Sequence, residues 1–464
     1  MAGVDRALAV WLWLPRSLRA LPWERSRNLP THAHKGVTVK ISRRTTAVAI
    51  AGATAFALVA TGCSSAAPGG TDPNEKITLT VATFNDFGYS DELLAEYTKE
   101  HPNVTVKQTK AKTSDDARAN YFTKLGAGSG LADVEAVEID WFAELLQYSD
   151  KLTDLSSDDV EGRWLDWKSN AATDADGRLI AYGTDIGPQA ICYRSDLFKA
   201  AGLPTDRKDV ATLLEGDWDH YFEVGQDFVA KSDAAWYDSV GSIMQGKLNQ
   251  EVETLEAKDG SVIAGENPVV EEAYKDILAQ SPDLSAHLSQ WSEDWYAAFS
   301  NGAYATMLCP SWMLGIIEGE AEGVEGWDIA DVYPNGGGNW GGSYLTVPAQ
   351  GAHPEAAKEF AAWLTAPEQQ LKAFVKTGNF PSQVALQDAP ELLEVTRPFF
   401  NDAPVGELMA GRAAAVPADA PFKGVKYFQV MTALQNSLTR VDVDKTQNAK
   451  DSWAQFLKDL DALK

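Results

Sequence analysis

Hydrophobic and polar positions first form a regular pattern near residue 77, where they predict a strand, a helix and a second strand. Residues 77–83 (ITLTVAT) are apolar and β-branched, as in a buried strand. Ser90 then precedes two acidic residues and an apolar stripe, which is the pattern of a capped helix that ends at His101-Pro102. Residues 104–106 form another β-branched run. This order predicts a βαβ unit with parallel strands and a right-handed crossover.

Strand and helix patterns alternate again further along the chain. Residues 191–193 predict a short strand, and a short helix follows from Ser195 to a stop at Gly202. Helices with one apolar face are also expected to open at Pro354, Pro367 and Asp451. We therefore predict an α/β fold.

In such sheets ligands bind beyond the carboxyl ends of the strands. Asn85 and Asp86 follow the first predicted strand, and Asp140 and Trp141 follow the strand-like residues 134–139. We expect all four to contact a ligand, although Asp140 could instead cap a helix. Asn85 and Asp86 could instead be turn residues.

A secretory signal lies ahead of these elements. Lys40, Arg43 and Arg44 are followed by sixteen uncharged residues, 45–60, and by Cys63. Sixteen residues fall short of the roughly 20 that a membrane-spanning helix needs, and the order of the regions is typical of a signal peptide. The ending Ala-Thr-Gly-Cys resembles a bacterial lipobox.

We therefore expect a lipoprotein signal peptide at 37–62, lipidation of Cys63, and a flexible tether at 63–74. A plain secretory signal with a chance cysteine is the alternative. The mature protein would be anchored by its lipid to the outer face of the cytoplasmic membrane, at the cell surface. Residues 1–36 show neither helical nor strand periodicity, and we hypothesise that natural translation starts after them, at Val37 or Val39.

Charge and length limit the function classes. The chain has 464 residues and a net charge of −26, and its first 62 residues are basic, so the remainder is more acidic still. Such a surface repels nucleic acid and anionic lipid headgroups, and we expect neither as a partner. A chain of this length is too long for one hydrophobic core and suits two lobes.

Motifs for catalysis are missing from the sequence. It contains no HExxH pattern, no GxSxG elbow and no phosphate-binding loop. We therefore expect no enzyme activity, no catalytic residue, no metal and no cofactor. So acidic a chain still offers many carboxylate pairs, which leaves a secreted lipoprotein glycoside hydrolase as an alternative.

Three cysteines are present, and lipidation of Cys63 would leave Cys192 and Cys309 as a pair in an oxidising compartment. A disulfide between them and two buried thiols are both compatible with the sequence.

Several segments, in order, resemble the extracellular solute-binding proteins of ABC sugar importers (family 1, the maltose-binding-like group). Residues 190–204 (AICYRSDLFKAAGLP) are similar to that family's LYYNKDLFEKAGLP, and residues 299–307 (FSNGAYATM) are similar to its FxNGxAAM. Weaker matches are the segments 100–104, 132–137, 310–312 and 340–357. The cysteines of the two central strands and Arg194 depart from the family pattern and suggest an actinobacterial lipoprotein type.

The resemblance implies a two-lobed periplasmic-binding-protein fold with the ligand in the interlobe cleft and closure by a hinge motion. From the family's crossing points we place lobe 1 at 75–187 plus 335–379 and lobe 2 at 188–334 plus 380–464. The expected partners are an oligosaccharide ligand and the ABC permease subunits in the membrane, with the ATPase acting indirectly. We expect a monomer.

A sugar site needs aromatic rings for the C–H faces of the sugar and polar groups for its hydroxyls. Three of the 15 tryptophans lie in residues 1–36, so most belong to the mature chain, where a core role is the alternative for each. Trp312 follows a predicted strand and matches the family's stacking Trp. We expect Trp312→Ala to weaken binding and to leave the melting temperature nearly unchanged.

Other candidate ligand contacts lie near the expected lobe crossings. They are Trp340, Gly341 and Gly342 in a Gly-rich strand, Asp185 before the first crossing, and Phe422 in a late loop. Asp185 could instead be a turn residue.

The predicted function is that of a substrate-binding lipoprotein of an ABC importer. It would capture a disaccharide or short oligosaccharide and deliver it to the permease. A peptide or a polyamine as the solute is the alternative within the same fold.

Overall fold

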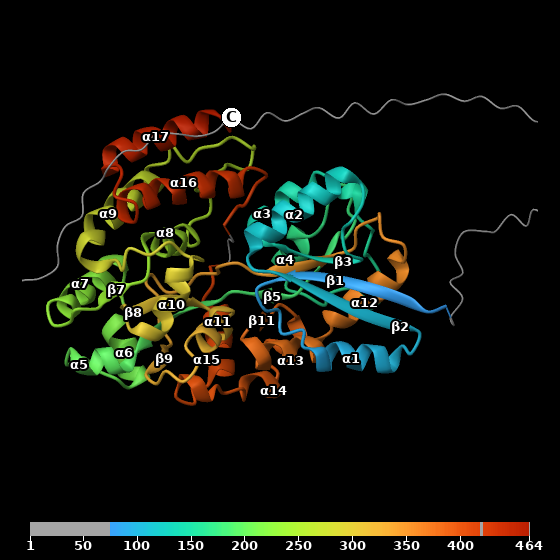
Figure 1. The fold of residues 1–464 in the computed structure, drawn as a ribbon, viewed down its shortest axis with the longest axis horizontal. Coiled ribbons are helices and arrows are strands. Elements are labelled where there is room, and N and C mark those ends of the chain that lie inside the picture. The colour runs from blue at the N-terminus through green and yellow to red at the C-terminus, as the bar shows by residue number, and fades with distance from the viewer. Residues whose placement is uncertain (1–74, 418–420, 464) are drawn as a thin grey trace, which may run out of the picture. The chain divides into compact units, whose positions relative to one another are not determined.

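The computed structural model describes residues 75–417 and 421–463, which form a mixed α/β structure with two main sheets (Figure 1). The first sheet has five strands in the order β2-β1-β3-β10-β4, and the second has four in the order β7-β8-β6-β9. Strands β11 and β5 form a separate pair. The predicted α/β fold is therefore confirmed. The predicted signal peptide, the tether and Cys63 lie outside the described residues.

The strands of the structure are β1 (Ile77–Phe84), β2 (Val104–Ala111), β3 (Val134–Glu138), β4 (Ala181–Gly183), β5 (Asp185–Ile186), β6 (Gln189–Arg194), β7 (Ala235–Tyr237), β8 (Tyr304–Pro310), β9 (Trp327–Ala330), β10 (Ser343–Thr346) and β11 (Phe380–Pro381). The α-helices are α1 (Asp91–Glu100), α2 (Ser114–Ala127), α3 (Ile139–Leu146), α4 (Asp166–Ala171), α5 (Ser195–Ala200), α6 (Arg207–Leu214), α7 (Trp218–Val229), α8 (Val240–Leu248), α9 (Pro268–Leu284), α10 (Glu293–Asn301), α11 (Met313–Glu320), α12 (Pro354–Leu364), α13 (Pro367–Thr377), α14 (Pro390–Leu393), α15 (Val405–Ala414), α16 (Tyr427–Asp442) and α17 (Ala449–Asp461). Short 3₁₀ turns are η1 (Ser149–Lys151), η2 (Asp158–Val160), η3 (Val384–Leu386) and η4 (Pro398–Phe400).

The predicted opening βαβ unit is present. Strand β1 pairs with β2 in parallel, from Ile77 opposite Val104 to Phe84 opposite Ala111. Between them, the Ser90 hydroxyl accepts a hydrogen bond from the Leu93 N–H and caps α1. The carboxyl ends of β1 and β2 therefore lie at the same edge of the sheet.

The first sheet is covered on both faces, because its side chains alternate between two hydrophobic clusters. Leu79 and Val81 of β1 pack with α1 and α12 on one face. Val137 of β3 and Tyr344 of β10 pack with α2 and α3 on the other. Strand β10 comes from late in the chain and lies antiparallel between β3 and β4, with Ser343 opposite Glu138.

The second sheet is centred on β6, which is buried along its whole length. Its side chains alternate between two further clusters. Cys192 of β6 and Cys309 of the antiparallel neighbour β8 are joined by a disulfide, with their Cα atoms 5.4 Å apart. Of the two arrangements that the sequence allows for these cysteines, the structure has the disulfide.

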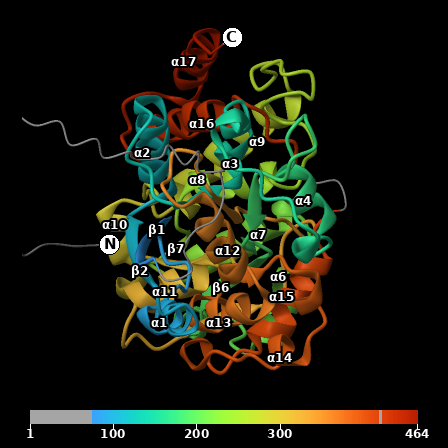
Figure 2. The same cartoon turned by 90° about the vertical axis from the view of Figure 1, so that its right-hand side faces the viewer.

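The chain passes from one sheet to the other in three segments, which lie around β5, between β9 and β10, and around β11. The first two segments touch through their backbones: the Trp340 N–H donates to Gly187 O at 2.8 Å. A Cβ atom on Gly187 would lie 1.8 Å from Trp340 O, so only glycine fits here. The predicted lobe boundaries lie in these three segments and stay a prediction. Figure 2 shows the whole fold turned by 90° about the vertical axis from the view of Figure 1.

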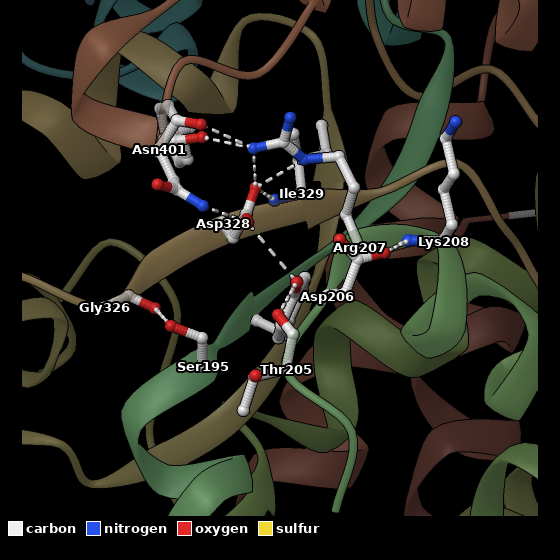
Figure 3. A network of polar contacts seen from close by, with 11 residues as sticks. Ser195, Thr205, Asp206, Arg207, Lys208, Gly326, Asp328, Ile329 and Asn401 are labelled. Atoms are coloured by element: carbon white, nitrogen blue, oxygen red, sulfur yellow. Dashed lines mark hydrogen bonds and ion pairs between the residues drawn. The ribbon is translucent and has the colours of Figure 1, made fainter.

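A polar network fixes the outer edge of the second sheet (Figure 3). Asp328 of β9 is 2% exposed and forms an ion pair with Arg207 at 2.9 Å. Arg207 Nη2 also donates to the backbone oxygens of Phe400 and Asn401, at 3.1 and 2.7 Å. Burial raises the pKa of Asp328, and the Ile329 N–H and Arg207 oppose that rise. One guanidinium thus joins α6, β9 and the end of η4.

We expect Arg207→Ala to lower the free energy of unfolding by about 2 kcal/mol, because it leaves a buried carboxylate without its cation. Lys208→Ala is the matched control: it removes the same charge from the neighbouring position, whose side chain is exposed, and should change stability by less than about 0.5 kcal/mol. Urea unfolding followed by circular dichroism measures both. Equal losses in the two variants would contradict the role of the ion pair.

Candidate functional site

A cavity of about 640 Å³ opens where the carboxyl ends of β1, β2 and β3 face elements that pack on the second sheet. This volume lies in the range of small-molecule sites, about 300–1,000 Å³. Segments that follow β1, β2 and β3 line one side of it, and the start of α8, the loop before α10, α11 and α16 line the other.

Asn85 and Asp86 follow β1 and line the cavity. Asn85 has a positive φ of 47°, which turns the chain sharply out of the strand. Asp86 Oδ1 accepts a bond from the Gly88 N–H at 2.9 Å and pairs with Lys110 at 3.2 Å. The Asp86 carbonyl accepts a bond from Asn379 Nδ2 at 3.1 Å. These contacts hold the loop at the rim of the cavity.

The end of β3 brings carboxylates into the cavity wall. Glu138 caps α3, its Oε2 accepting a bond from the Asp140 N–H at 2.8 Å. The alternative role of Asp140 as a helix cap is therefore filled by Glu138. Asp140 forms an ion pair with Lys423, which comes from the segment before α16.

Burial and neighbouring charges shift the pKa values of Glu138 and Lys423. Burial, and then the neighbouring Asp140 carboxylate, raise the pKa of Glu138 well above its usual range, whereas Lys423 opposes that rise. Burial alone would lower the pKa of Lys423, but Asp140 and then Tyr427 raise it overall. The cavity wall thus contains the Glu138 carboxyl group beside Asp140, which is paired with Lys423.

The crossing segments form the floor. Asp185 is buried, and its Oδ1 accepts bonds from Thr184 Oγ1 at 2.8 Å and the Ser343 N–H at 3.0 Å. Burial raises its pKa, which Lys168 opposes. Gly342 has a φ of 111°, and a Cβ atom there would lie 2.8 Å from Asp185 O. Close packing of the protein's own backbone thus requires this glycine.

Aromatic rings form one wall. Trp312 donates its indole N–H to Trp340 O at 2.8 Å, and these two rings meet edge to face at 5.8 Å. Trp291 lies nearly parallel to Trp312, with ring centroids 6.0 Å apart and an interplanar angle of 23°. Tyr296 also lines the wall. Trp312 packs against two hydrophobic clusters, so Trp312→Ala should also lower the melting temperature, contrary to our expectation from the sequence.

Amide and hydroxyl groups line the wall that α16 contributes. Successive turns of this helix place Phe428, Met431, Thr432, Gln435, Asn436 and Thr439 on the cavity. Gln245 of α8 is another lining residue, and its side chain is oriented by bonds to Asn249 and Tyr427. The cavity therefore combines apolar ring faces with donors and acceptors on several sides.

Residues 92–396 match the family model described as bacterial extracellular solute-binding protein. The chain belongs to the bacterial extracellular solute-binding proteins. Membership in this family implies an extracellular or periplasmic location. Its relatives, described next, are also named as binding proteins.

One relative is the arabinooligosaccharide-binding protein of Bacillus subtilis strain 168, which is 27% identical over 345 residues, 68% of this chain and 75% of the relative. A crystal structure of an extracellular solute-binding protein of family 1 is 44% identical, with a TM-score of 0.73 over 83% of this chain and 99% of that one. The ABC transporter-associated binding protein of B. animalis subsp. lactis Bl-04, solved with β-1,6-galactobiose, is 21% identical with a TM-score of 0.70. It covers 83% of this chain and 97% of its own. These structures show that the solute-binding protein has the two-lobed fold.

The structure brings most of the predicted site residues of this solute-binding protein to one cavity. They are Asn85, Asp86, Asp140, Asp185, Trp312, Trp340, Gly341 and Gly342. Their contact with a ligand stays a prediction. Trp141 does not line the cavity: it is fully buried among α2 and α3, and its indole N–H donates to Ser114 Oγ at 2.9 Å. Phe422 is half-buried and also lies outside the cavity lining.

Some lining residues escape the sequence patterns. Glu138 is the last residue of β3, whereas the sequence pattern extends this strand to residue 139 and makes only the residues after it candidates. Trp291 lies in a loop without periodicity, which the sequence does not distinguish from a surface or core position. The polar face of α16 has the spacing of an ordinary solvent-facing helix.

Among residues 75–417 and 421–463, no group of three or more His, Cys, Asp or Glu side chains is placed to hold a metal ion. No helix of these same ranges combines the length and the apolarity needed to cross a membrane.

Lys168 generates a prediction on pH dependence. It is fully buried beneath the floor, donates to Asp185 O at 2.8 Å, and lies over the Tyr344 ring at 3.8 Å. Burial lowers its pKa to about 7, against the charges of Asp185 and Glu138. Between that value and the ordinary lysine pKa near 10.4, the unfolded chain binds more protons than the folded one, so the Lys168 contribution to stability increases with pH.

The free energy of unfolding of the wild type, relative to Lys168→Met, should therefore rise from pH 7 to pH 9. Urea unfolding of both proteins at each pH measures this difference, and all other titrating groups cancel in it to first order. A difference that does not change with pH would show that Lys168 titrates as an exposed lysine.

Proposed function

We propose that this protein is the substrate-binding component of an ABC importer and that it captures a disaccharide or short oligosaccharide in the cavity. One observation carries the proposal: the 640 Å³ cavity combines an aromatic wall of Trp291, Trp312 and Trp340 with amide and carboxyl groups on the facing walls. Aromatic ring faces pack well against the C–H faces of sugars. Buried polar groups select for ligands with hydroxyl groups, because a buried donor or acceptor without a hydrogen-bond partner costs free energy. The names of the relatives in B. subtilis and B. animalis support a sugar.

The remaining parts of the proposal extend the family role. Lobe 1 comprises 75–187 and 335–379, lobe 2 comprises 188–334 and 380–464, and the lobes close around the ligand by bending in the crossing segments. The closed form delivers the sugar to the permease subunits without chemical change. The protein acts as a monomer held to the outer face of the membrane by a lipid on Cys63.

Titration of the purified protein tests the cargo. The panel comprises arabinotriose, β-1,6-galactobiose, maltose, a tripeptide and spermidine. A ligand at 100 times its dissociation constant adds about 2.7 kcal/mol of stability, which a thermal shift detects readily. We expect a shift with an oligosaccharide that is recovered uncleaved. A shift with only the tripeptide or spermidine would reject the sugar, and cleaved products would indicate an enzyme.

Trp312→Ala should weaken oligosaccharide binding at least about tenfold, or 1.4 kcal/mol, because it removes a ring from the aromatic wall. Trp363→Ala is the matched control, since Trp363 lies on α12 with its indole N–H bonded to Glu100 and takes no part in the cavity lining. Calorimetry well below both melting temperatures separates binding from stability. Equal affinities in the two variants would show that Trp312 does not contribute to ligand binding.

A further inference from the structure

The loop of residues 285–292 joins α9 to α10 and supplies four consecutive residues to the cavity, Leu288 to Trp291. Its conformation is unusual for its sequence. His287 has a φ of 56° and Trp291 a φ of 68°. Bulky side chains rarely adopt this left-handed region, so the surrounding contacts must hold the loop in place.

A buried carboxylate provides the anchor at the start of the loop. Asp442 is 3% exposed, and its two oxygens accept bonds from Ser285 Oγ at 2.8 Å and His287 Nδ1 at 2.9 Å. The Ser285 hydroxyl also accepts a bond from the His287 N–H at 2.9 Å. On the opposite side, the Ala286 N–H donates to Tyr237 O of β7 at 2.9 Å. The first three loop residues are thus tied to both α16 and the second sheet.

Asp442 is the last residue of α16, and this helix lines the cavity through its preceding turns. The anchor therefore joins two elements that both form the cavity wall. It sets the position of the loop relative to the polar side chains of α16.

The far end of the loop presents Trp291. Its ring lies 5.0 Å from that of Trp295 and 6.0 Å from that of Trp312. Trp295 is itself fixed, since its indole N–H donates to the fully buried Asp238 at 2.8 Å. Trp291 thus lies against a fixed ring on one side, and it follows the anchored His287 by four residues in the same loop.

We propose that the His287–Asp442 contact positions Trp291 in the aromatic wall, which makes His287 a positioning residue for ligand binding. This rests on the proposed function only for the identity of the ligand. His287 acts through the backbone of the loop, with no contact of its own to the ligand: it is absent from the cavity lining.

The test compares His287→Asp with His287→Asn. The two new side chains have the same shape, and both tolerate a left-handed backbone. Asn keeps a donor toward Asp442, whereas Asp places a second carboxylate against it. His287→Asp should weaken binding of arabinotriose or β-1,6-galactobiose about tenfold, and His287→Asn should stay within about threefold.

A double-mutant cycle with Trp291→Ala separates positioning from a general structural effect. In the Trp291→Ala background, His287→Asp should weaken binding less than about twofold. A full tenfold loss in that background, or equal affinities of the Asp and Asn variants, would overturn the proposal. If His287→Asp does not fold, His287→Gly removes the contact without adding charge or backbone strain.

A readout without ligand keeps this proposal separate from the proposed function. In protein labelled with 5-fluorotryptophan, the ¹⁹F signal missing from Trp291→Phe identifies Trp291. That signal should shift or broaden in His287→Asp and stay in place in His287→Asn. An unshifted signal in His287→Asp would overturn the positioning role. If no sugar binds the wild type, the proposed function fails, and the ¹⁹F spectra still decide the role of His287.

Discussion

The backbone contact between Gly187 and Trp340 is the constraint on which the rest of the site depends. It presses the two crossing segments together, with room for no Cβ atom on Gly187. The indole of Trp312 is oriented by the same segment, through Trp340 O. The Gly187 N–H also donates to Asn339 Oδ1 at 2.9 Å, so backbone and side-chain hydrogen bonds together join the two segments at the floor of the cavity.

Ionisable groups gather around that floor. Burial shifts the pKa values of Glu138, Lys168 and Asp185, whereas the pKa of Lys423 is raised by Asp140 and Tyr427 against the effect of burial. Burying charged groups destabilises a fold unless their partners are well placed, so such clusters are concentrated at functional sites. Of these groups Glu138 and Asp185 line the cavity, and their hydrogen bonds to the protein fix the directions of both carboxyl groups.

The sequence could predict most of the framework, because periodicity and caps report on local structure. The strand β1, the Ser90-capped helix α1 and the pairing with β2 follow from such patterns. The expectation that ligands bind beyond the carboxyl ends of strands led to Asn85, Asp86 and Asp140, which line the cavity. The same expectation was wrong for Trp141, because this residue lies one position further into α3 and its side chain points into the core. Trp291 and the polar face of α16 could not be predicted, since tertiary packing alone brings them to the cavity.

The Cys192–Cys309 disulfide has a consequence for handling the protein. Both cysteines have 0% exposure and lie between strands at the centre of the second sheet. A reductant can reach the sulfurs only when these strands separate, so the rate of reduction under native conditions reports how often that part of the molecule opens. Protein made in a reducing cytoplasm would lack this cross-link from the start, and its refolding yield would depend on the redox buffer.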